Sequence, residues 1–343
     1  MNISNGAIYT VRAPSRLHFT LIDMNGESGR IDGGLGLALD SPSLVLQFKQ
    51  ADYLQVNASH EKVAKMAKQE LINMANTMGI LPNLEVCVQE VIPSHIGLGS
   101  GTQWRLCLLT ALNHIYKCGL NHHQLISQSN RGGTSGVGIY ASASGGLLLD
   151  GGHALSDKSH FEPSDFCKVT RQPPLIMRYD FPDHWKIVLF IPDHLTGLSG
   201  EEEQTFMHAN TPIPKHEVQN VSLIILMHLL PALVEKDLRE LGIALNKLQH
   251  VGWKKRHWDR PNLKPLDAVR AAFLQSGIAG CGLSSTGPLL FGFFDTHHIN
   301  ADQIRANLMY YLNQNNALKG TIQITSANNT GTQIYTARSL ASG

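Results

Sequence analysis

Residues 92–103 form a glycine-rich segment, Ile-Pro-Ser-His-Ile-Gly-Leu-Gly-Ser-Gly-Thr-Gln, between two contrasting patterns. A run typical of a β-strand (84–91) precedes it, and apolar residues at helical spacing (108–116) follow it. The first N–H groups of a helix have no partner within the helix, so a glycine loop entering a helix is suited to bind phosphate. The segment matches neither the Walker loop nor GxGxxG. The alternative interpretation is an ordinary strand-to-helix turn.

Size and composition favour a globular protein with two lobes. The 343 residues are too many for one ordinary core, and 43% of them are hydrophobic. The net charge of +1 gives no reason to expect a nucleic acid or an anionic membrane as a partner. Five scattered cysteines without a CxxC pair suit a reducing compartment, and the polar N-terminus lacks a signal segment. We therefore expect a cytoplasmic protein.

The pattern of periodic segments predicts a mixed α+β chain. Expected helices cover 61–79, most of 216–250, 264–277 and 301–314, and expected strands cover 147–149, 185–191, 289–294, 321–325 and 332–336. A polar, proline-containing stretch (156–184) marks the predicted boundary between an N-terminal lobe, 1–165, and a C-terminal lobe, 166–343. The longest apolar run, 221–234, contains Ser222, His228 and Pro231 and is too short to span a bilayer.

Three motifs occur in a characteristic order along the chain. They are Ala-Pro-Ser-Arg-Leu-His-Phe at 13–19, the loop at 93–103, and the glycine-rich turn at 282–288. Together they resemble the three signatures of the GHMP kinase superfamily. The resemblance implies a two-lobed α+β fold with a glycine-rich phosphate loop between the lobes.

A narrower resemblance covers nearly the full length. The segments at 16–26, 29–37, 95–103, 131–138, 150–153 and 197–203 resemble the β-ribofuranosylaminobenzene 5′-phosphate synthase family. This resemblance implies a methanopterin-type biosynthetic reaction: phosphoribosyl pyrophosphate and 4-aminobenzoate form a C-riboside 5′-phosphate, with release of CO2 and pyrophosphate. It also implies dependence on Mg²⁺ and a homodimer.

The motifs depart from those of ordinary kinases in this superfamily. The loop keeps Ser100 but continues Gly101-Thr102-Gln103, where kinases commonly have Ser-Ala. The second region reads Ser-Gly-Val-Gly at 135–138, where kinases tend to have Ser-Gly-x-Asp. The missing carboxylate fits the synthase, because the departure of CO2 instead of a proton leaves no need for a base. Such an enzyme must mainly hold two anionic substrates, stabilise the leaving pyrophosphate and exclude water.

The glycine loop supplies the first group of candidate residues. The predicted pyrophosphate contacts are Gly97, Gly99, Ser100, Gly101 and Thr102, and Gln103 is a contact or a structural start of the helix. Ser100 and Glu203 are the predicted contacts of Mg²⁺, which prefers phosphate oxygens, waters and one or two carboxylates. The alternative for Glu203 is a solvated helix surface, since it ends the acidic run 201–203.

Five residues are predicted to be catalytic: Arg16, His18, Asp23, His95 and Asp150. The fork of Arg16 suits a phosphate or the benzoate carboxylate. His95 can donate to the leaving pyrophosphate, and Asp23 or Asp32 can orient the substrate amine or a metal. The alternatives are a surface arginine beside a core histidine, a structural His95, and a tight turn at Asp150.

Further substrate contacts are predicted in five segments. The residues predicted to make these contacts are Arg30, Asp32, Arg131, Ser135, Gly136, His153, Ser284, Ser285, Thr286 and Gly287. Simple glycine turns are the alternative at 32–34 and 284–287. The basic run at 253–260, interleaved with aromatic residues, is a candidate anchor for the ribose 5-phosphate or a plain surface. Its nucleic-acid interpretation is disfavoured in a neutral chain.

The sequence thus favours a synthase with small-molecule substrates and with no nucleic-acid or membrane partner. The second hypothesis is an ATP-dependent small-molecule kinase of the GHMP family, and the third is a catalytically inactive binding protein. The motifs do not separate 4-aminobenzoate from 4-hydroxybenzoate as acceptor, because one amine or hydroxyl contact decides that choice.

Overall fold

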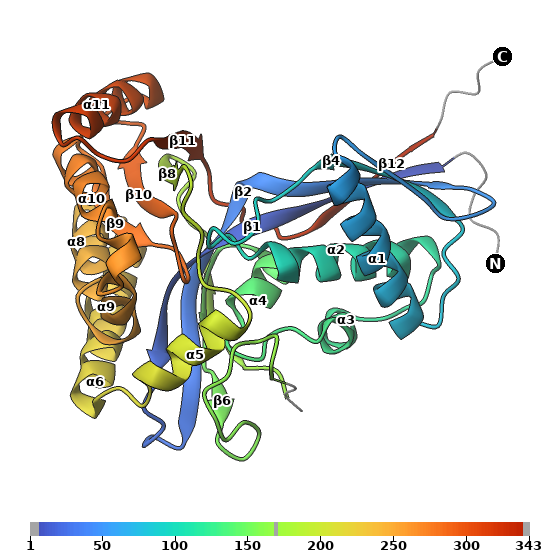
Figure 1. Ribbon diagram of the computed structural model, residues 1–343, viewed down its shortest axis with the longest axis horizontal. Helices are drawn as coiled ribbons and strands as arrows, with labels where there is room; N and C mark the ends of the chain where they lie inside the picture. The colour runs from blue at the N-terminus through green and yellow to red at the C-terminus, as the bar shows by residue number, and fades with distance from the viewer. Residues whose placement is uncertain (1–6, 168–170, 339–343) are drawn as a thin grey trace.

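The computed structural model describes residues 7–167 and 171–338, which form two lobes on two β-sheets (Figure 1). The strands are β1 (Ala7–Asp23), β2 (Arg30–Gln50), β3 (Gln55–Ala58), β4 (Leu84–Glu90), β5 (Leu147–Asp150), β6 (His153–Ala154), β7 (Leu175–Tyr179), β8 (Trp185–Pro192), β9 (Ala279–Leu283), β10 (Leu290–Asp295), β11 (Gly320–Thr325) and β12 (Gln333–Arg338). The α+β expectation is confirmed.

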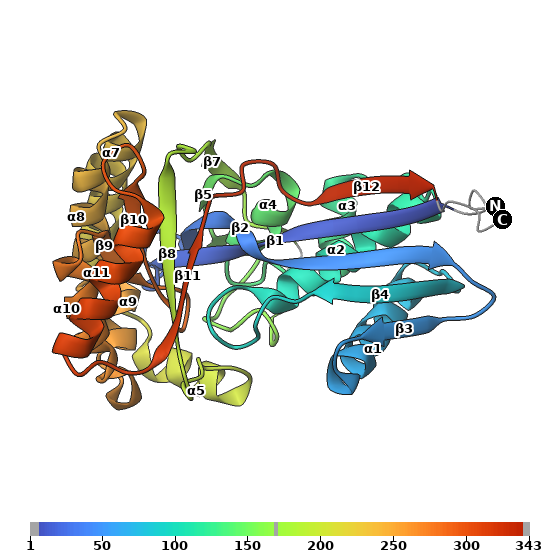
Figure 2. The same ribbon diagram turned by 90° about the horizontal axis from the view of Figure 1, so that it is seen from above.

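Helices cover one side of each sheet (Figure 2). They are α1 (Glu61–Thr77), α2 (Ser100–Ile115), α3 (His122–Ser129), α4 (Val137–Ser144), α5 (Glu201–Asn210), α6 (Lys215–Ile224), π-helical η1 (Ile225–Leu229), α7 (Leu230–Val234), α8 (Leu238–Leu248), α9 (Gly252–Trp258), 3₁₀-helical η2 (Pro261–Leu263), α10 (Leu266–Gln275) and α11 (Ala301–Gln314).

The first sheet is organised around two long strands. Its order is β12-β1-β2-β4-β3, and β5 and β6 also pair with β2 while β7 extends from β5. The 21-residue β2 changes neighbours along its length, from β5 at Gly34–Leu37 to β4 at Val45–Gln50. β7 and β12 join this sheet although they follow residue 165. The division of the chain at 165/166 stays a prediction, and these two strands are the segments that cross it.

The second sheet shares its core with the first. Its order is β11-β8-β10-β9, all antiparallel, and α8, α10 and α11 lie on its outer side (Figure 2). Phe19 of β1 stacks on Phe291 of β10 with ring centroids 5.0 Å apart. Both side chains are fully buried and belong to one apolar cluster that spans the two lobes. The lobes are therefore held together by hydrophobic burial as well as by hydrogen bonds.

Main-chain hydrogen bonds join the glycine-rich loop to the second lobe. The Leu289 amide donates to the Ile96 carbonyl at 3.2 Å, and the Gly197 amide donates to the His95 carbonyl at 2.7 Å. The Ser285 amide donates to the His18 carbonyl at 2.9 Å. The first two bonds fix the loop against the second lobe, and the third fixes the turn that leads into β10 against β1.

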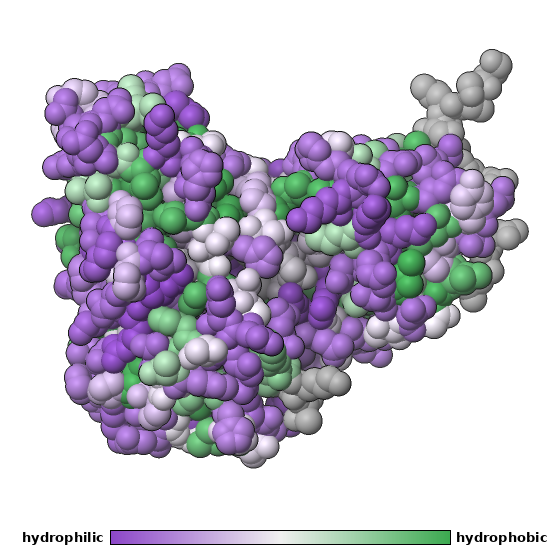
Figure 3. Space-filling model, in the orientation of Figure 1, coloured by the Kyte–Doolittle hydropathy of each residue, from purple (hydrophilic) through white to green (hydrophobic). Residues whose placement is uncertain are grey.

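One helical stretch corrects an expectation from the sequence. α6, η1 and α7 run without a break over Lys215–Val234, so this apolar segment is 20 residues long and meets the length and composition of a membrane span. A core helix meets the same criterion, and Val221, Ile225 and Leu229 of this stretch are buried. On the face shown in Figure 3, polar residues predominate and apolar residues form small patches. The absence of a membrane partner and the cytoplasmic location stay predictions.

Gly36 of β2 provides a test of how tightly the first lobe is packed. A Cβ at this position would lie 2.3 Å from the Leu17 carbonyl oxygen and 2.5 Å from Cγ1 of Val137. We expect Gly36→Ala to lower the free energy of unfolding by about 2–3 kcal/mol, because backbone and core cannot both move aside. Urea unfolding followed by circular dichroism measures the change.

Gly138 of α4 offers the matched control. A Cβ there would meet only the Thr102 side chain, at 3.3 Å or more, and alanine is the better helix former. Gly138→Ala is expected to change the free energy of unfolding by less than about 1 kcal/mol. Equal effects of the two substitutions would contradict the close packing of β2 on β1 and α4.

Candidate active site

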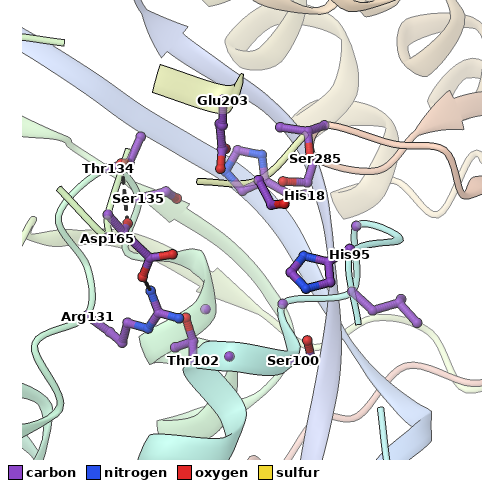
Figure 4. A pocket seen from close by; sticks show the side chains of 18 of the residues that line it. His18, His95, Ser100, Thr102, Arg131, Thr134, Ser135, Asp165, Glu203 and Ser285 are labelled. Carbon is purple, nitrogen blue, oxygen red and sulfur yellow. Dashed lines mark hydrogen bonds and ion pairs between the residues drawn. The ribbon is translucent and has the colours of Figure 1, made fainter. Parts of the chain in front are cut away.

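A cavity of about 380 Å³ lies where the glycine-rich loop meets the second lobe (Figure 4). The loop, β1 and the segment 131–135 contribute residues from the first lobe, and residues 253–254 and 285–286 contribute from the second. The predicted residues that line it are Arg16, His18, His95, Gly97, Gly99, Ser100, Gly101, Thr102, Arg131, Ser135, Glu203, Ser285 and Thr286. Its volume lies within the range of small-molecule sites.

The glycine loop has the backbone of an anion site. Gly97 and Gly99 have φ of 100° and 75°, in the region that favours glycine. Gly99 precedes α2 and has no side chain to cap the helix, so the first amides of α2 remain available to a ligand. Arg16 Nη1 donates to the Gly97 carbonyl at 2.6 Å, which holds the guanidinium beside the loop. The predicted order of strand, glycine loop and helix is confirmed.

Burial lowers the pKa of four basic side chains that line the cavity: Arg16, His18, Arg131 and Lys254. The pKa of Arg16 is lowered to about 10, chiefly by burial, with Glu203 opposing the shift and Arg131 adding to it. The pKa of His18 lies well below its usual value because of burial and the nearby Arg16 and Lys254. His18 is therefore a neutral imidazole, and the cavity is a concentration of desolvated positive charge.

Lys254 is the residue that the sequence reasoning most clearly missed. Its side chain is 1% exposed and lines the cavity, and Nζ donates to the carbonyls of Leu283 and Ser285, both at 2.6 Å. Burial and Arg16 lower its pKa well below the usual value. The basic run 253–260 was the available signal, but only a three-dimensional structure shows which of its cations points inward.

Acidic side chains also line the cavity, and Asp165 and Glu203 are two of them. Asp165, which was not predicted, forms an ion pair with Arg131. Burial raises the pKa of Glu203 to about 7, and Asp165 raises it too, while Arg16 and Arg131 oppose the shift. Glu203 is thus poised near neutral pH, and its proton affinity responds to any cation or anion that binds beside it.

Asp150 lies behind the cavity wall and holds a residue of that wall in place. Its carboxylate accepts hydrogen bonds from Ser135 Oγ (2.9 Å) and from the amides of Gly136 (2.8 Å) and Gly152 (2.9 Å). The side chain is 1% exposed, and burial raises its pKa to about 6. Asp150 and Gly136 do not line the cavity, so Asp150 holds Ser135 from behind the lining, and its predicted catalytic role stays a prediction.

Four predicted residues lie outside the cavity lining and have structural contacts instead. Asp23 accepts hydrogen bonds from the amides of Asn25 and Gly26, which closes the turn after β1. Arg30 donates to the carbonyls of Gly151 and Gly152. Asp32, His153 and Lys158 form a buried cluster, with Asp32 Oδ2 2.8 Å from His153 Nδ1 and 2.9 Å from Lys158 Nζ. The predicted chemical roles of Asp23, Arg30, Asp32 and His153 stay predictions, without support from these positions.

The other predicted residues outside the lining act within the loop and the turn. Gln103 donates to the Gly138 carbonyl at 2.8 Å, which joins α2 to α4. Ser284 Oγ donates to the Gly97 carbonyl at 2.7 Å, and Gly287 turns the chain with a φ of 77°. These residues shape the cavity from behind its surface.

Comparisons with known proteins agree with this geometry. The GHMP kinase N-terminal domain family matches residues 52–146, and the GHMP kinase C-terminal family matches residues 229–311. The β-ribofuranosylphenol 5′-phosphate synthase of Archaeoglobus fulgidus is 36% identical over 94% of this chain and 98% of its own length. The enzyme of the same name from Methanocaldococcus jannaschii is 33% identical over 95% of this chain and 99% of its own length.

Solved structures show the same fold at low sequence identity. Homoserine kinase from Cytophaga hutchinsonii matches with a TM-score of 0.65 and 15% identity, over 98% of this chain and 99% of its own. Mevalonate diphosphate decarboxylase from Staphylococcus aureus matches with a TM-score of 0.60 and 13% identity, over 96% and 98%. The resemblance to the aryl ribofuranosyl phosphate synthases is confirmed: this chain belongs to the β-ribofuranosylphenol 5′-phosphate synthase family, within the GHMP kinase superfamily, and is an enzyme.

Proposed function

We propose that this enzyme transfers the phosphoribosyl group of phosphoribosyl pyrophosphate to a 4-substituted benzoate, with loss of CO2 and pyrophosphate, in methanopterin-type biosynthesis. The observation that carries the proposal is the cavity, which combines a glycine-rich helix start with the buried Lys254 and the partly buried Arg16 and Arg131. Two anionic substrates are the natural complement of such a site. The names of the curated relatives support a reaction of this class.

The cavity walls suggest where each substrate binds. The start of α2 and Arg131 suit the pyrophosphate, because they offer amides and a guanidinium fork on the same side. Leu21, Met207 and Trp253 line the cavity and form one apolar cluster, which suits an aryl ring. Lys254 from the second lobe and Arg16 beside the glycine loop suit a carboxylate or the ribose 5-phosphate.

The reaction needs no general base. The bond between ribose C1 and pyrophosphate breaks, and pyrophosphate leaves with the electron pair. The ring carbon that bears the carboxylate bonds to C1, and the ring–carboxylate bond then breaks, which returns its electrons to the ring and releases CO2. The residues bind both substrates, neutralise the developing charge on pyrophosphate and exclude water. Asp150 is committed to three hydrogen bonds, as expected if no base is required.

Mg²⁺ is the proposed metal, and the residues present fit it. Asp165 and Glu203 lie close enough for the charge of one to raise the pKa of the other, and a cation would relieve this repulsion. Glu203 and Ser100 are the proposed protein contacts, with substrate oxygens and water as the others. When bound, Mg²⁺ would neutralise charge on the leaving pyrophosphate.

The identity of the acceptor is a finer question. The expectation from the sequence is 4-aminobenzoate, whereas the relatives are named for a phenol product, which favours 4-hydroxybenzoate. Both substituents donate electrons to the ring, so both suit the same chemistry. Competition between the two acids at equal concentration decides which one this chain prefers.

We further propose a homodimer without a nucleic-acid partner.

We expect stoichiometric release of CO2 and pyrophosphate. Purified enzyme with Mg²⁺, phosphoribosyl pyrophosphate and carboxyl-labelled 4-aminobenzoate or 4-hydroxybenzoate is followed by trapping labelled CO2 and by an enzymatic pyrophosphate assay. Equal amounts of the two products support the synthase. Consumption of ATP with an alcohol acceptor would instead support the kinase hypothesis, and tight substrate binding without turnover would support the binding protein.

Arg16 and Arg12 form a matched pair on β1. Arg16 is buried beside the glycine loop, whereas Arg12 pairs with Asp40 at the surface. We expect Arg16→Met to lower kcat/KM by about 10²–10³-fold, because a desolvated charge that contacts substrate is lost. Arg12→Met should leave kcat/KM within about twofold. Similar losses in both variants would argue that Arg16 acts through folding rather than through substrate.

The pH dependence tests Glu203. With a pKa of about 7, this carboxyl is protonated below neutral pH and ionised above it. If the ionised form serves Mg²⁺ and substrate, kcat/KM falls about tenfold per pH unit below pH 7. Glu203→Gln is expected to lower activity and to remove this acid limb. Glu201→Gln, an exposed change on the same helical turn, should keep the limb, and its loss there would contradict the assignment.

A further inference from the structure

A second cluster of possible metal ligands lies far from the cavity. His184 precedes β8, while Asp295 ends β10 and His297 follows it. Asp295 pairs with Trp185 in the sheet, and the glycine-rich turn of the active site enters β10 at its other end, by Leu290. At ~3.4 Å per residue the five steps of β10 place the cluster roughly 17 Å from that turn. No part of the proposed reaction uses these side chains.

The three side chains already present their ligand atoms to one another. One ligand atom from each lies within 4.8 Å of the other two. His184 Nε2 is 3.9 Å from Asp295 Oδ2, and His297 Nδ1 is 3.6 Å from Asp295 Oδ1. These distances are too long for hydrogen bonds. They are near the separation of about 3.4 Å between two ligands of a tetrahedral ion that binds each at 2.0–2.2 Å.

The two imidazole rings of the cluster are stacked, with centroids 4.4 Å apart and an interplanar angle of 10°. The lone pair of a ring nitrogen lies in the plane of its ring, so one ion bound by both histidines requires one ring to turn out of this stack. The His297 side chain is the exposed one of the two and is free to make that turn.

The backbone holds these residues in place. The Thr296 amide and hydroxyl both donate to the His184 carbonyl at 3.0 Å, which ties the two chain segments together. The His297 amide donates to Asp295 Oδ1 at 2.8 Å and so orients the carboxylate. His184 also packs edge-on against Trp185, which is 1% exposed. Such outer contacts are what keeps metal ligands in register.

We propose that His184, Asp295 and His297 bind a divalent transition-metal ion of the zinc class, with water in the remaining positions. Two nitrogens and one carboxylate suit Zn²⁺, Co²⁺, Ni²⁺ or Cu²⁺, whereas Mg²⁺ prefers oxygen ligands. The His297 side chain is 68% exposed, and those of His184 and Asp295 are 28% and 15% exposed, so the ion has an entry path. The ion would join the start of β8 to the turn after β10 and stabilise the second sheet.

The test uses the full chain without a histidine tag, stripped with a chelator and kept in excess Mg²⁺ to occupy oxygen-rich sites. Calorimetric titration with Zn²⁺ should show one equivalent bound, and Co²⁺ should give the visible absorption of a nitrogen-coordinated ion. A hundredfold excess of Zn²⁺ over its Kd should raise Tm by about 3–6 °C.

Two variants separate the site from general histidine binding. His297→Asn should weaken Zn²⁺ binding at least about tenfold and abolish the Tm shift, because a direct ligand is lost. His298→Asn is the matched control, since this exposed neighbour is not part of the cluster, and it should bind as the wild type does. The proposal is overturned if the wild type binds no Zn²⁺ under these conditions, or if His297→Asn binds it unchanged.

Discussion

The site depends on a seam of hydrogen bonds between the glycine-rich loop and the turn after β9. The Ser284 hydroxyl accepts from the His18 amide at 3.1 Å and donates to the Gly97 carbonyl at 2.7 Å. A Cβ on Gly97 would lie 2.3 Å from the Ser284 carbonyl oxygen, so only glycine permits this approach. One serine therefore aligns β1, the phosphate loop and the second lobe, and the cations Arg16 and Lys254 of the cavity lie on two of these segments.

The residues beside this seam give the cavity an excess of positive charge, which suits anionic ligands. Burial lowers the pKa values of Arg16 and Lys254, which means that both charges are poorly solvated where they stand. Glu203 offsets them only in part, because burial and Asp165 raise its pKa to about 7. Anionic substrates would supply the missing counter-charge, so substrate binding and cavity electrostatics favour each other.

The sequence predicts local pattern well and long-range placement poorly. Strand, glycine loop and helix follow from periodicity, and the loop glycines and Arg16 do line the cavity. Lys254 lies in the basic run 253–260, which suggested an anchor or a plain surface, and Asp165 lies in a polar stretch without a motif; only the fold shows that both line the cavity. Asp32 shows the converse: its motif suggested a substrate contact, but the fold buries it against His153 and Lys158. Local motifs predict the conformation of the backbone, whereas the direction in which a side chain points depends on tertiary packing.

The crowding around Gly34 bears on how a kinase-like fold can support a different reaction. A Cβ on Gly34 would lie 2.3 Å from Ser135 Oγ, 2.9 Å from Asp150 Oδ2 and 3.0 Å from His18 Nε2. These three polar groups therefore meet at one point, and the carboxylate among them is buried and already hydrogen-bonded. A hydroxyl acceptor needs a free carboxylate to take its proton, whereas a benzoate releases CO2 and needs none. The fold can thus keep the phosphate loop of a kinase while using its nearest buried carboxylate as structural support.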